Sequence, residues 1–279
     1  MRLEMADERR DVTRTGTVPT VGWVWVFFAV TLLVSGAIVG LIGGVLDNPD
    51  ATILAVLVPS LAAIVLTSIT DGWSGVRSLL RPGGSEPTSI VLLLGAALAV
   101  PVVGLIAIAI GGAVTGDSFD FAMPSDGLVV LIPLLVIAVG EEYGWRGYAL
   151  PGLQTRYLAL IAALVVGAVH WIWHFPASLI DTGVPLDTPF WLFGAWVLAL
   201  GVIAAALYNQ SSGSVGLVIV LHFAANATFV FLPLLPENRG GELTTFSIFV
   251  GLSVLAAAMI TVVAGPTTLT RARSGRARA

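Results

Sequence analysis

The chain of 279 residues contains no cysteine, and this absence removes several kinds of chemistry at once. Disulfide bridges, thiolate nucleophiles and cysteine-ligated metal sites are all excluded. Charged residues are also scarce, at 11%, whereas 57% of the residues are hydrophobic. A soluble domain of this length needs a charged surface, which so few and clustered charges cannot supply. The composition therefore predicts a membrane protein.

Eight apolar segments are long enough to cross a membrane, because a hydrocarbon core of ~30 Å needs about 20 helical residues. They cover residues 22–45, 51–70, 90–114, 127–149, 158–180, 189–208, 214–235 and 244–265. We predict an all-α, polytopic bundle of about eight transmembrane helices. The series Gly36, Gly40 and Gly44 on the first of them is typical of close helix packing.

The arginines predict the orientation, because basic residues in short loops stay on the cytoplasmic side of a membrane. With eight spans and a cytoplasmic N-terminus, 12 of the 13 basic residues fall in cytoplasmic segments, and Arg239 alone lies outside. Both termini are therefore predicted to be cytoplasmic, in a multi-pass protein of the cell membrane. The absence of lysine and the abundance of Ala, Val and Gly favour a GC-rich bacterial genome, and hence a bacterial inner membrane.

Within the predicted spans, three charged residues lie close together: Glu141, Glu142 and Arg146, near the inner end of the fourth span. A charge at the centre of a membrane helix costs roughly 2.5 to 3.5 kcal/mol, so three of them need a reason. Glu142 and Arg146 are four residues apart and can pair along one helix, whereas Glu141 points about 100° away. This leaves Glu141 as the free carboxylate, which is suited to taking a proton from water.

The three histidines of the chain lie in two later spans. His170 and His174, in "GAVHWIWHFP", have the i, i+4 spacing of helical metal sites. His222 and Asn226, in "LHFAANATF", repeat that spacing. If the three helices face one another, the bundle encloses a site that can hold either a metal ion with its water or a water directly. Both arrangements support hydrolysis.

Each of these features also has a purely structural explanation. Glu142 and Arg146 could form a salt bridge at a helix end, and for this pair alone the structural and functional explanations are equally good. His170 taken singly is a packing residue, and Asn226 taken singly is an ordinary interhelical hydrogen-bonding group. The conjunction of polar groups on three separate spans favours a functional site.

Three short motifs resemble those of the CAAX prenyl endopeptidase and bacteriocin-processing family of intramembrane proteases (the CPBP, or ABI, family). The stretch "EEYGWRGYALPGLQTRY" resembles the first motif, Glu-Glu-x-x-x-Arg; "HWIWHFP" resembles the second, Phe-x-x-x-His; and "HFAAN" resembles the third, His-x-x-x-Asn. They occur in the order that the family has. His170 stands where the second motif has Phe, and we interpret it as an aromatic substitute; an extra ligand or a proton relay are the alternatives.

The resemblance implies a role for each matching residue. Glu141 would be the catalytic base that activates water, supported by Glu142 and Arg146. Asn226 would help to bind the water or the oxyanion that forms when the peptide carbonyl is attacked.

The resemblance also implies what the histidines hold. His174 and His222 would bind the water directly or bind a metal ion, with Glu141 as a third ligand. The cofactor predicted in that second case is Zn²⁺, and the enzyme would then be a metalloprotease.

The resemblance divides the chain into five parts. These are a cytoplasmic N-terminal segment (1–20), N-terminal transmembrane helices (21–126), a catalytic core (127–235), a last transmembrane region (236–266) and a basic cytoplasmic tail (267–279).

The predicted function is an intramembrane endopeptidase that hydrolyses a peptide bond of a membrane-associated protein or peptide. Eukaryotic members of the family trim prenylated C-terminal tails, but the bacterial composition argues against that substrate. The alternative is a non-catalytic transporter or an immunity or assembly factor that uses the same polar cluster. The predicted partners are the substrate and the lipid bilayer. Nothing in the sequence indicates nucleic-acid binding, and the oligomeric state is not predicted.

Overall fold

The computed structural model describes residues 18–86, 88–116, 118–119, 121, 127–236 and 241–271, and all secondary structure within these ranges is helical. Seven segments are long and apolar enough to span a membrane: Val21–Val45, Ile53–Leu79, Ile90–Thr115, Gly127–Gln154, Ala159–Ser178, Phe190–Gln210 and Leu243–Ala264. An eighth helix, α9 (Val215–Phe231), is apolar but shorter, at 17 residues. The predicted all-α membrane bundle is thus confirmed.

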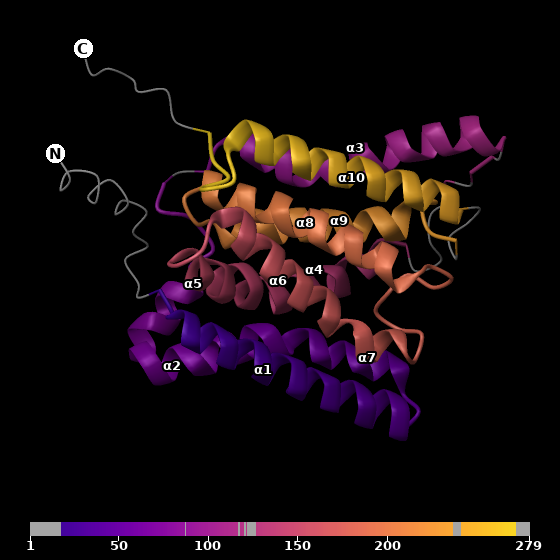
Figure 1. Cartoon of the computed structure of the whole chain (residues 1–279). Helices are drawn as coiled ribbons and strands as arrows, with labels where there is room; N and C mark the ends of the chain where they lie inside the picture. The colour runs from indigo at the N-terminus through magenta and orange to yellow at the C-terminus, as the bar shows by residue number, and fades with distance from the viewer. Residues whose placement is uncertain are drawn as a thin grey trace, which may run out of the picture.

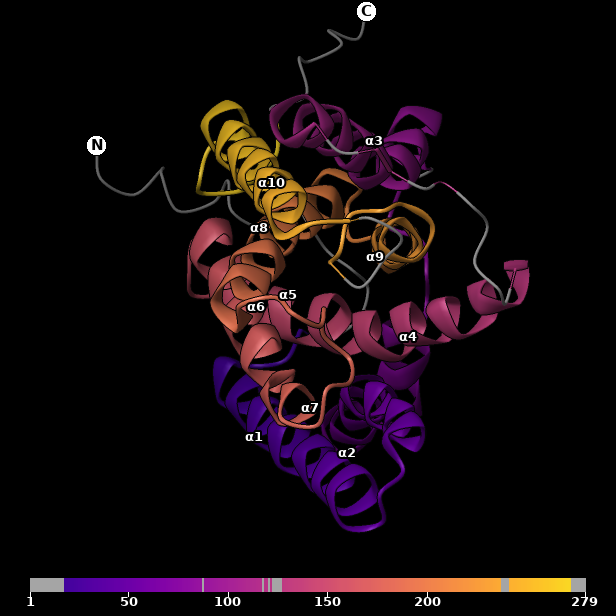
Figure 2. The same ribbon diagram turned by 90° about the vertical axis from the view of Figure 1, so that its right-hand side faces the viewer.

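The helices form three layers (Figures 1 and 2). Helix α1 (Val21–Ile38) packs with α2 (Val58–Leu79) on one side, and α3 (Ile90–Thr115) packs with α10 (Leu243–Ala264) on the other. The middle layer consists of α4 (Leu131–Gly144), α6 (Ala159–Trp173), α8 (Phe190–Gln210) and α9. The first and last described residues lie at the same end of the bundle (Figure 1), and the cytoplasmic location of this end stays a prediction.

The second span is longer than the sequence predicted. It begins with a 3₁₀ helix, Pro49–Leu57, and continues as α2 to Leu79, whereas the prediction ended at residue 70. Its helix is broken at Gly72, which has φ 63° and ψ −160°, a conformation that is open to glycine because it lacks Cβ. The chain resumes its helix after the break because Val76 and Leu79 are buried against the bundle.

The fourth span also extends beyond its predicted end at residue 149. A 3₁₀ turn (Gly127–Val130) leads into α4, which is followed by a π-helical turn (Trp145–Ala149) and by α5 (Leu150–Gln154). Pro151 does not stop this segment because it lies in the first turn of α5, where its missing N–H costs nothing. Glu141 and Glu142 lie in the last turn of α4 and near the middle of the whole segment. Their predicted position near the inner side of the membrane stays a prediction.

Two glycines hold α4 close against the second span. A Cβ at Gly140 would lie 2.7 Å from the carbonyl oxygen of Val56, and a Cβ at Gly144 would lie 2.6 Å from that of Pro59. Next to Gly140, the carbonyl oxygen of Val139 accepts a hydrogen bond of 3.0 Å from the hydroxyl of Ser60. Small residues and a side-chain hydrogen bond thus replace the hydrophobic driving force that is absent between helices in lipid.

The glycines predicted to pack the first helix do not do so. Nothing lies within 4 Å of a Cβ built at Gly40 or Gly44, and Gly36 has one ordinary contact, with Pro176. Gly40 and Gly44 belong instead to a π-helical turn, Val39–Val45, that ends the first span. Their spacing alone could not distinguish these two uses of glycine.

The chain after α10 returns to the start of α6. The N–H groups of Ala159 and Leu160 donate hydrogen bonds of 3.0 and 3.1 Å to the carbonyl oxygens of Thr267 and Pro266. The first N–H groups of a helix lack partners within the helix. The segment after α10 therefore caps the helix that carries His170.

Candidate active site

Glu142 joins two helices at the centre of the bundle. Its Oε1 atom accepts one hydrogen bond of 2.7 Å from Arg146 and another of 2.7 Å from Nδ1 of His222, on α9. The predicted i, i+4 pair of Glu142 and Arg146 is thus present. All three side chains are buried. Because an ionised carboxylate can only accept, Nδ1 of His222 is the donor, and Nε2 is left for another partner.

Glu141 has a partner that the sequence did not predict. Its Oε2 atom lies 2.8 Å from Nε2 of His170, and both side chains are buried. Among the described residues, neither atom makes an aligned hydrogen bond, so this is a close polar contact. The expectation that Glu141 is a carboxylate without a partner is therefore wrong. The two residues lie on α4 and α6, and only the packing of these helices brings them together.

His170 is held between two other rings. It stacks on Trp145 with ring centroids 4.9 Å apart and on His174 with centroids 5.0 Å apart. These stacks fit its interpretation as an aromatic substitute, and the contact with Glu141 adds a polar interaction that Phe could not make. The carbonyl oxygen of His170 lies 2.9 Å from Nδ1 of His174. A carbonyl only accepts, so Nδ1 of His174 carries the proton and its Nε2 is left as an acceptor.

The π-helical turn Trp145–Ala149 places large side chains inside the bundle. Trp145, Arg146 and Tyr148 are almost completely buried there. Such turns are rare and often occur at functional sites. The indole N–H groups of Trp145 and Trp173 have no hydrogen-bond acceptor among the described residues. These two donors beside the histidines were not predicted as site residues, although Trp145 falls within the first motif.

Asn226 is half-buried on α9, one helical turn beyond His222. Its role in binding the water or the oxyanion stays a prediction. Trp171, by contrast, faces away from the polar cluster: it stacks on Phe190 and donates a hydrogen bond of 3.0 Å to the carbonyl oxygen of Phe190.

The predicted zinc ligands are not gathered into a three-ligand group. Within the described part of the chain, no group of three His, Asp or Glu side chains is arranged to hold a metal ion. Glu141 faces His170, and Nδ1 of His222 is used by Glu142. The residues thus do not fit a three-ligand zinc site in this arrangement, and bound zinc stays a prediction.

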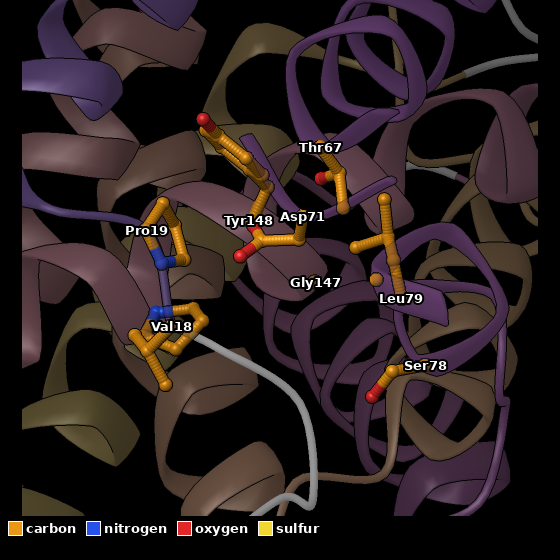
Figure 3. Close-up of a pocket in the computed structure, with 10 residues that line it drawn as sticks. Val18, Pro19, Thr67, Asp71, Ser78, Leu79, Gly147 and Tyr148 are labelled. Atoms are coloured by element: carbon orange, nitrogen blue, oxygen red, sulfur yellow. The ribbon is translucent and has the colours of Figure 1, made fainter. Parts of the chain in front are cut away.

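A cavity of about 30 Å³ lies beside the π-helical turn (Figure 3), where Gly147 and Tyr148 face Thr67 and Asp71 of α2. A water needs roughly 10 to 15 Å³ of such volume. The cavity can therefore hold a water molecule or two, but it is too small for a peptide.

Comparisons with known proteins agree with these motifs. Residues 124–228 match the model of the type II CAAX prenyl endopeptidase Rce1-like family. This part of the chain is thus similar to that family. The matched region includes Glu141, Arg146, His174 and His222, so the predicted family resemblance is confirmed there.

A curated relative supports the same family. The chain is 28% identical over 158 residues to CAAX prenyl protease 2 of Methanococcus maripaludis. The alignment covers 54% of this chain and 58% of that protein. The boundaries predicted for the five parts of the chain stay predictions.

Proposed function

We propose that this protein is an intramembrane endopeptidase that uses Glu141 to activate water. One observation carries the proposal: two adjacent buried carboxylates each contact a histidine from a different helix, Glu141 with His170 and Glu142 with His222. Burying such groups in a membrane bundle is costly unless they have a function. The family to which residues 124–228 are matched supports peptide-bond hydrolysis.

In the proposed reaction, the water donates one hydrogen bond to Nε2 of His174, and its other hydrogen faces Glu141. Nε2 of His222 lies beside the same water. These two ring nitrogens are the ones that the other contacts of the histidines leave available. Glu141 takes a proton from this water as the oxygen of the water attacks the peptide carbonyl. The side-chain amide of Asn226 donates to the developing oxyanion. The C–N bond then breaks as the proton on Glu141 passes to the leaving amine. The products are a carboxylic acid and an amine, which become a carboxylate and an ammonium once the acid proton passes to the amine, and Glu141 returns to its starting state.

Glu142 and Arg146 support this reaction without touching the substrate. The Arg146 guanidinium balances the charge of Glu142, and Glu142 fixes the orientation of the His222 ring. His170 is a positioning residue: it stacks on Trp145 and contacts the carboxylate that acts as the base.

The substrate class follows from the comparison. The relative is named a CAAX prenyl protease, and we therefore propose a prenylated C-terminal peptide as the first substrate to test. The bacterial composition argued against a prenylated substrate. Cleavage of a prenylated peptide in the assay below decides between these two expectations. Residues 124–228 lie in a bundle of membrane-spanning helices. The substrate must therefore reach a site near the middle of the fourth membrane-spanning segment.

The central test compares Glu141→Gln with the wild-type protein in reconstituted liposomes. The substrate is a farnesylated peptide with a fluorescent group on either side of the scissile bond. We expect cleavage to fall by roughly 10² to 10⁴-fold, the usual contribution of a general base. Asp187→Asn is the matched control, because Asp187 is an exposed carboxylate in a loop, and it should cleave at the wild-type rate.

Cleavage at the wild-type rate by Glu141→Gln would overturn the proposal. If no peptide is cut but ion or solute flux depends on Glu141, the transporter alternative holds instead. Zinc is tested separately by metal analysis of the purified protein. One zinc per chain, lost in His174→Ala and His222→Ala, would confirm the zinc prediction.

A further inference from the structure

An apolar groove of about 550 Å³ lies on the lipid-facing side of the bundle, away from the carboxylates. Its walls come from α3, α8 and α10, and its floor includes Leu221 of α9. This volume is in the range of ~300 to 1,000 Å³ that is typical of small-molecule sites. Met259 and Val263, at its edge on α10, are each 55% exposed, so the groove opens towards the membrane.

Small residues on α3 create the groove. Gly95, Ala96 and Ala99 line it, and a Cβ built at Gly95 meets no atom within 4 Å. Farther along the same helix the packing is tight: a Cβ at Gly104 would lie 3.0 Å from Thr228, and one at Gly111 would collide with Thr245. Helix α3 is therefore held closely at its second half, and an unfilled space remains at its first half.

One end of the groove is polar and positively charged. The segment after α10 crosses it there, fixed by hydrogen bonds from Asn209 to the carbonyl oxygen of Thr268 (2.8 Å) and from the N–H of Arg271 to Gln210 (3.0 Å). Gln210 and Arg271 both line the groove, and Arg271 is its one ionisable lining residue. Among the described residues, the exposed side chain of Arg271 forms no ion pair.

We propose that this groove binds one anionic phospholipid, with an acyl chain between α3, α8 and α10 and the phosphate at Arg271. The walls offer apolar surface and almost no hydrogen-bonding groups, which suits a hydrocarbon chain and not a peptide backbone. Arg271 follows the end of a membrane-spanning helix, where a lipid headgroup lies. The arginine supplies the charge that distinguishes an anionic headgroup from a neutral one. This site is separate from the proposed protease site.

The experiment measures lipid retention by native mass spectrometry of the full chain, delipidated in detergent and incubated with phosphatidylglycerol or phosphatidylcholine. The wild type should retain one phosphatidylglycerol molecule and prefer it roughly fivefold over phosphatidylcholine. This preference is equivalent to ~1 kcal/mol for one arginine at a membrane surface. Arg271→Gln should lose the preference but keep the lipid. Gly95→Leu, whose Cβ would meet no atom within 4 Å and whose longer side chain occupies the groove, should lose both lipids.

Two matched controls separate the groove from general effects. Arg156→Gln removes an exposed positive charge elsewhere, and Gly251→Leu adds a side chain at another glycine whose Cβ would meet nothing within 4 Å. Both variants should retain phosphatidylglycerol with the same preference over phosphatidylcholine as the wild type. Equal retention of the two lipids by the wild type, or unchanged retention by Gly95→Leu, would overturn the proposal. Displacement of the phospholipid by farnesol at equal concentration would also overturn it, because the groove would then be a prenyl site.

Discussion

Glu141 and Glu142 are neighbours in sequence, but their surroundings differ. Glu142 accepts two charge-assisted hydrogen bonds on a single oxygen, from Arg146 and His222. Glu141 has one close contact, with His170, and no aligned hydrogen bond within the described residues. A carboxylate that accepts several hydrogen bonds, as Glu142 does, can hold the donor side chains in fixed orientations. A carboxylate with fewer donors keeps the lone pairs that a base needs.

His170 gives the sharpest test at the scale of single residues. His170→Phe keeps the ring that stacks on Trp145 but removes the nitrogen 2.8 Å from Glu141. We expect kcat to fall on the order of 100-fold, as misplacement of a catalytic group does, with KM and thermal stability unchanged. His170→Ala should lower thermal stability as well. If His170→Phe keeps the wild-type kcat, His170 is an aromatic substitute and has no positioning role.

The sequence predicted the site residues better than their contacts. Glu142 and Arg146 could be paired because helical geometry alone places residues i and i+4 together. The contacts of Glu141 with His170 and of Glu142 with His222 depend on how three helices are rotated in the bundle. Periodicity cannot give that rotation in a membrane protein, because almost every face of these helices is apolar.

At the scale of elements, α4 is positioned by its backbone and not by bulky side chains. Gly140 and Gly144 flank the two glutamates and bring α4 into contact with Val56 and Pro59. The position of Glu141 and Glu142 thus depends on two residues that have no side chain to contribute to chemistry.

Gly144→Ala should therefore damage both stability and activity. Its Cβ would lie 2.6 Å from the Pro59 carbonyl, and overpacking of this kind costs about 1 to 3 kcal/mol. We expect a lower thermal midpoint in detergent and slower peptide cleavage. Gly40→Ala is the matched control, since its Cβ would meet nothing within 4 Å. Equal thermal midpoints for the two variants would contradict this account of the helix contact.

The helices themselves were largely predictable, and their interruptions were not. Apolar length located all eight segments, because the membrane requires about 20 residues for each. The break at Gly72 and the π-helical turn after Gly144 depend on local backbone choices. In both places the helix continues because residues beyond the irregular turn are buried, which a hydropathy pattern does not reveal.

At the scale of the whole molecule, the bundle has two ends that are chemically different. The loop after α2 and the start of α1 lie at one end, and the last turn of α3 lies at the other. The distribution of arginine predicts that the first end is cytoplasmic.

The absence of cysteine makes this orientation easy to test. Ser85→Cys and Ser118→Cys each introduce a single thiol at an exposed position, in the loops before and after α3. In intact cells, a membrane-impermeant maleimide should label Ser118→Cys, and it should label Ser85→Cys only after permeabilisation. The reverse pattern would place both termini outside.

The cap on α6 links two parts of the chain that are more than 100 residues apart. The carbonyl oxygens of Pro266 and Thr267 satisfy the first N–H groups of the helix that carries His170. A protease nick or an affinity tag placed just after Ala264 would thus leave two amide groups unpaired at the start of that helix. The last described residues thus support the helix that carries His170 and His174, and tags are best attached beyond Arg271.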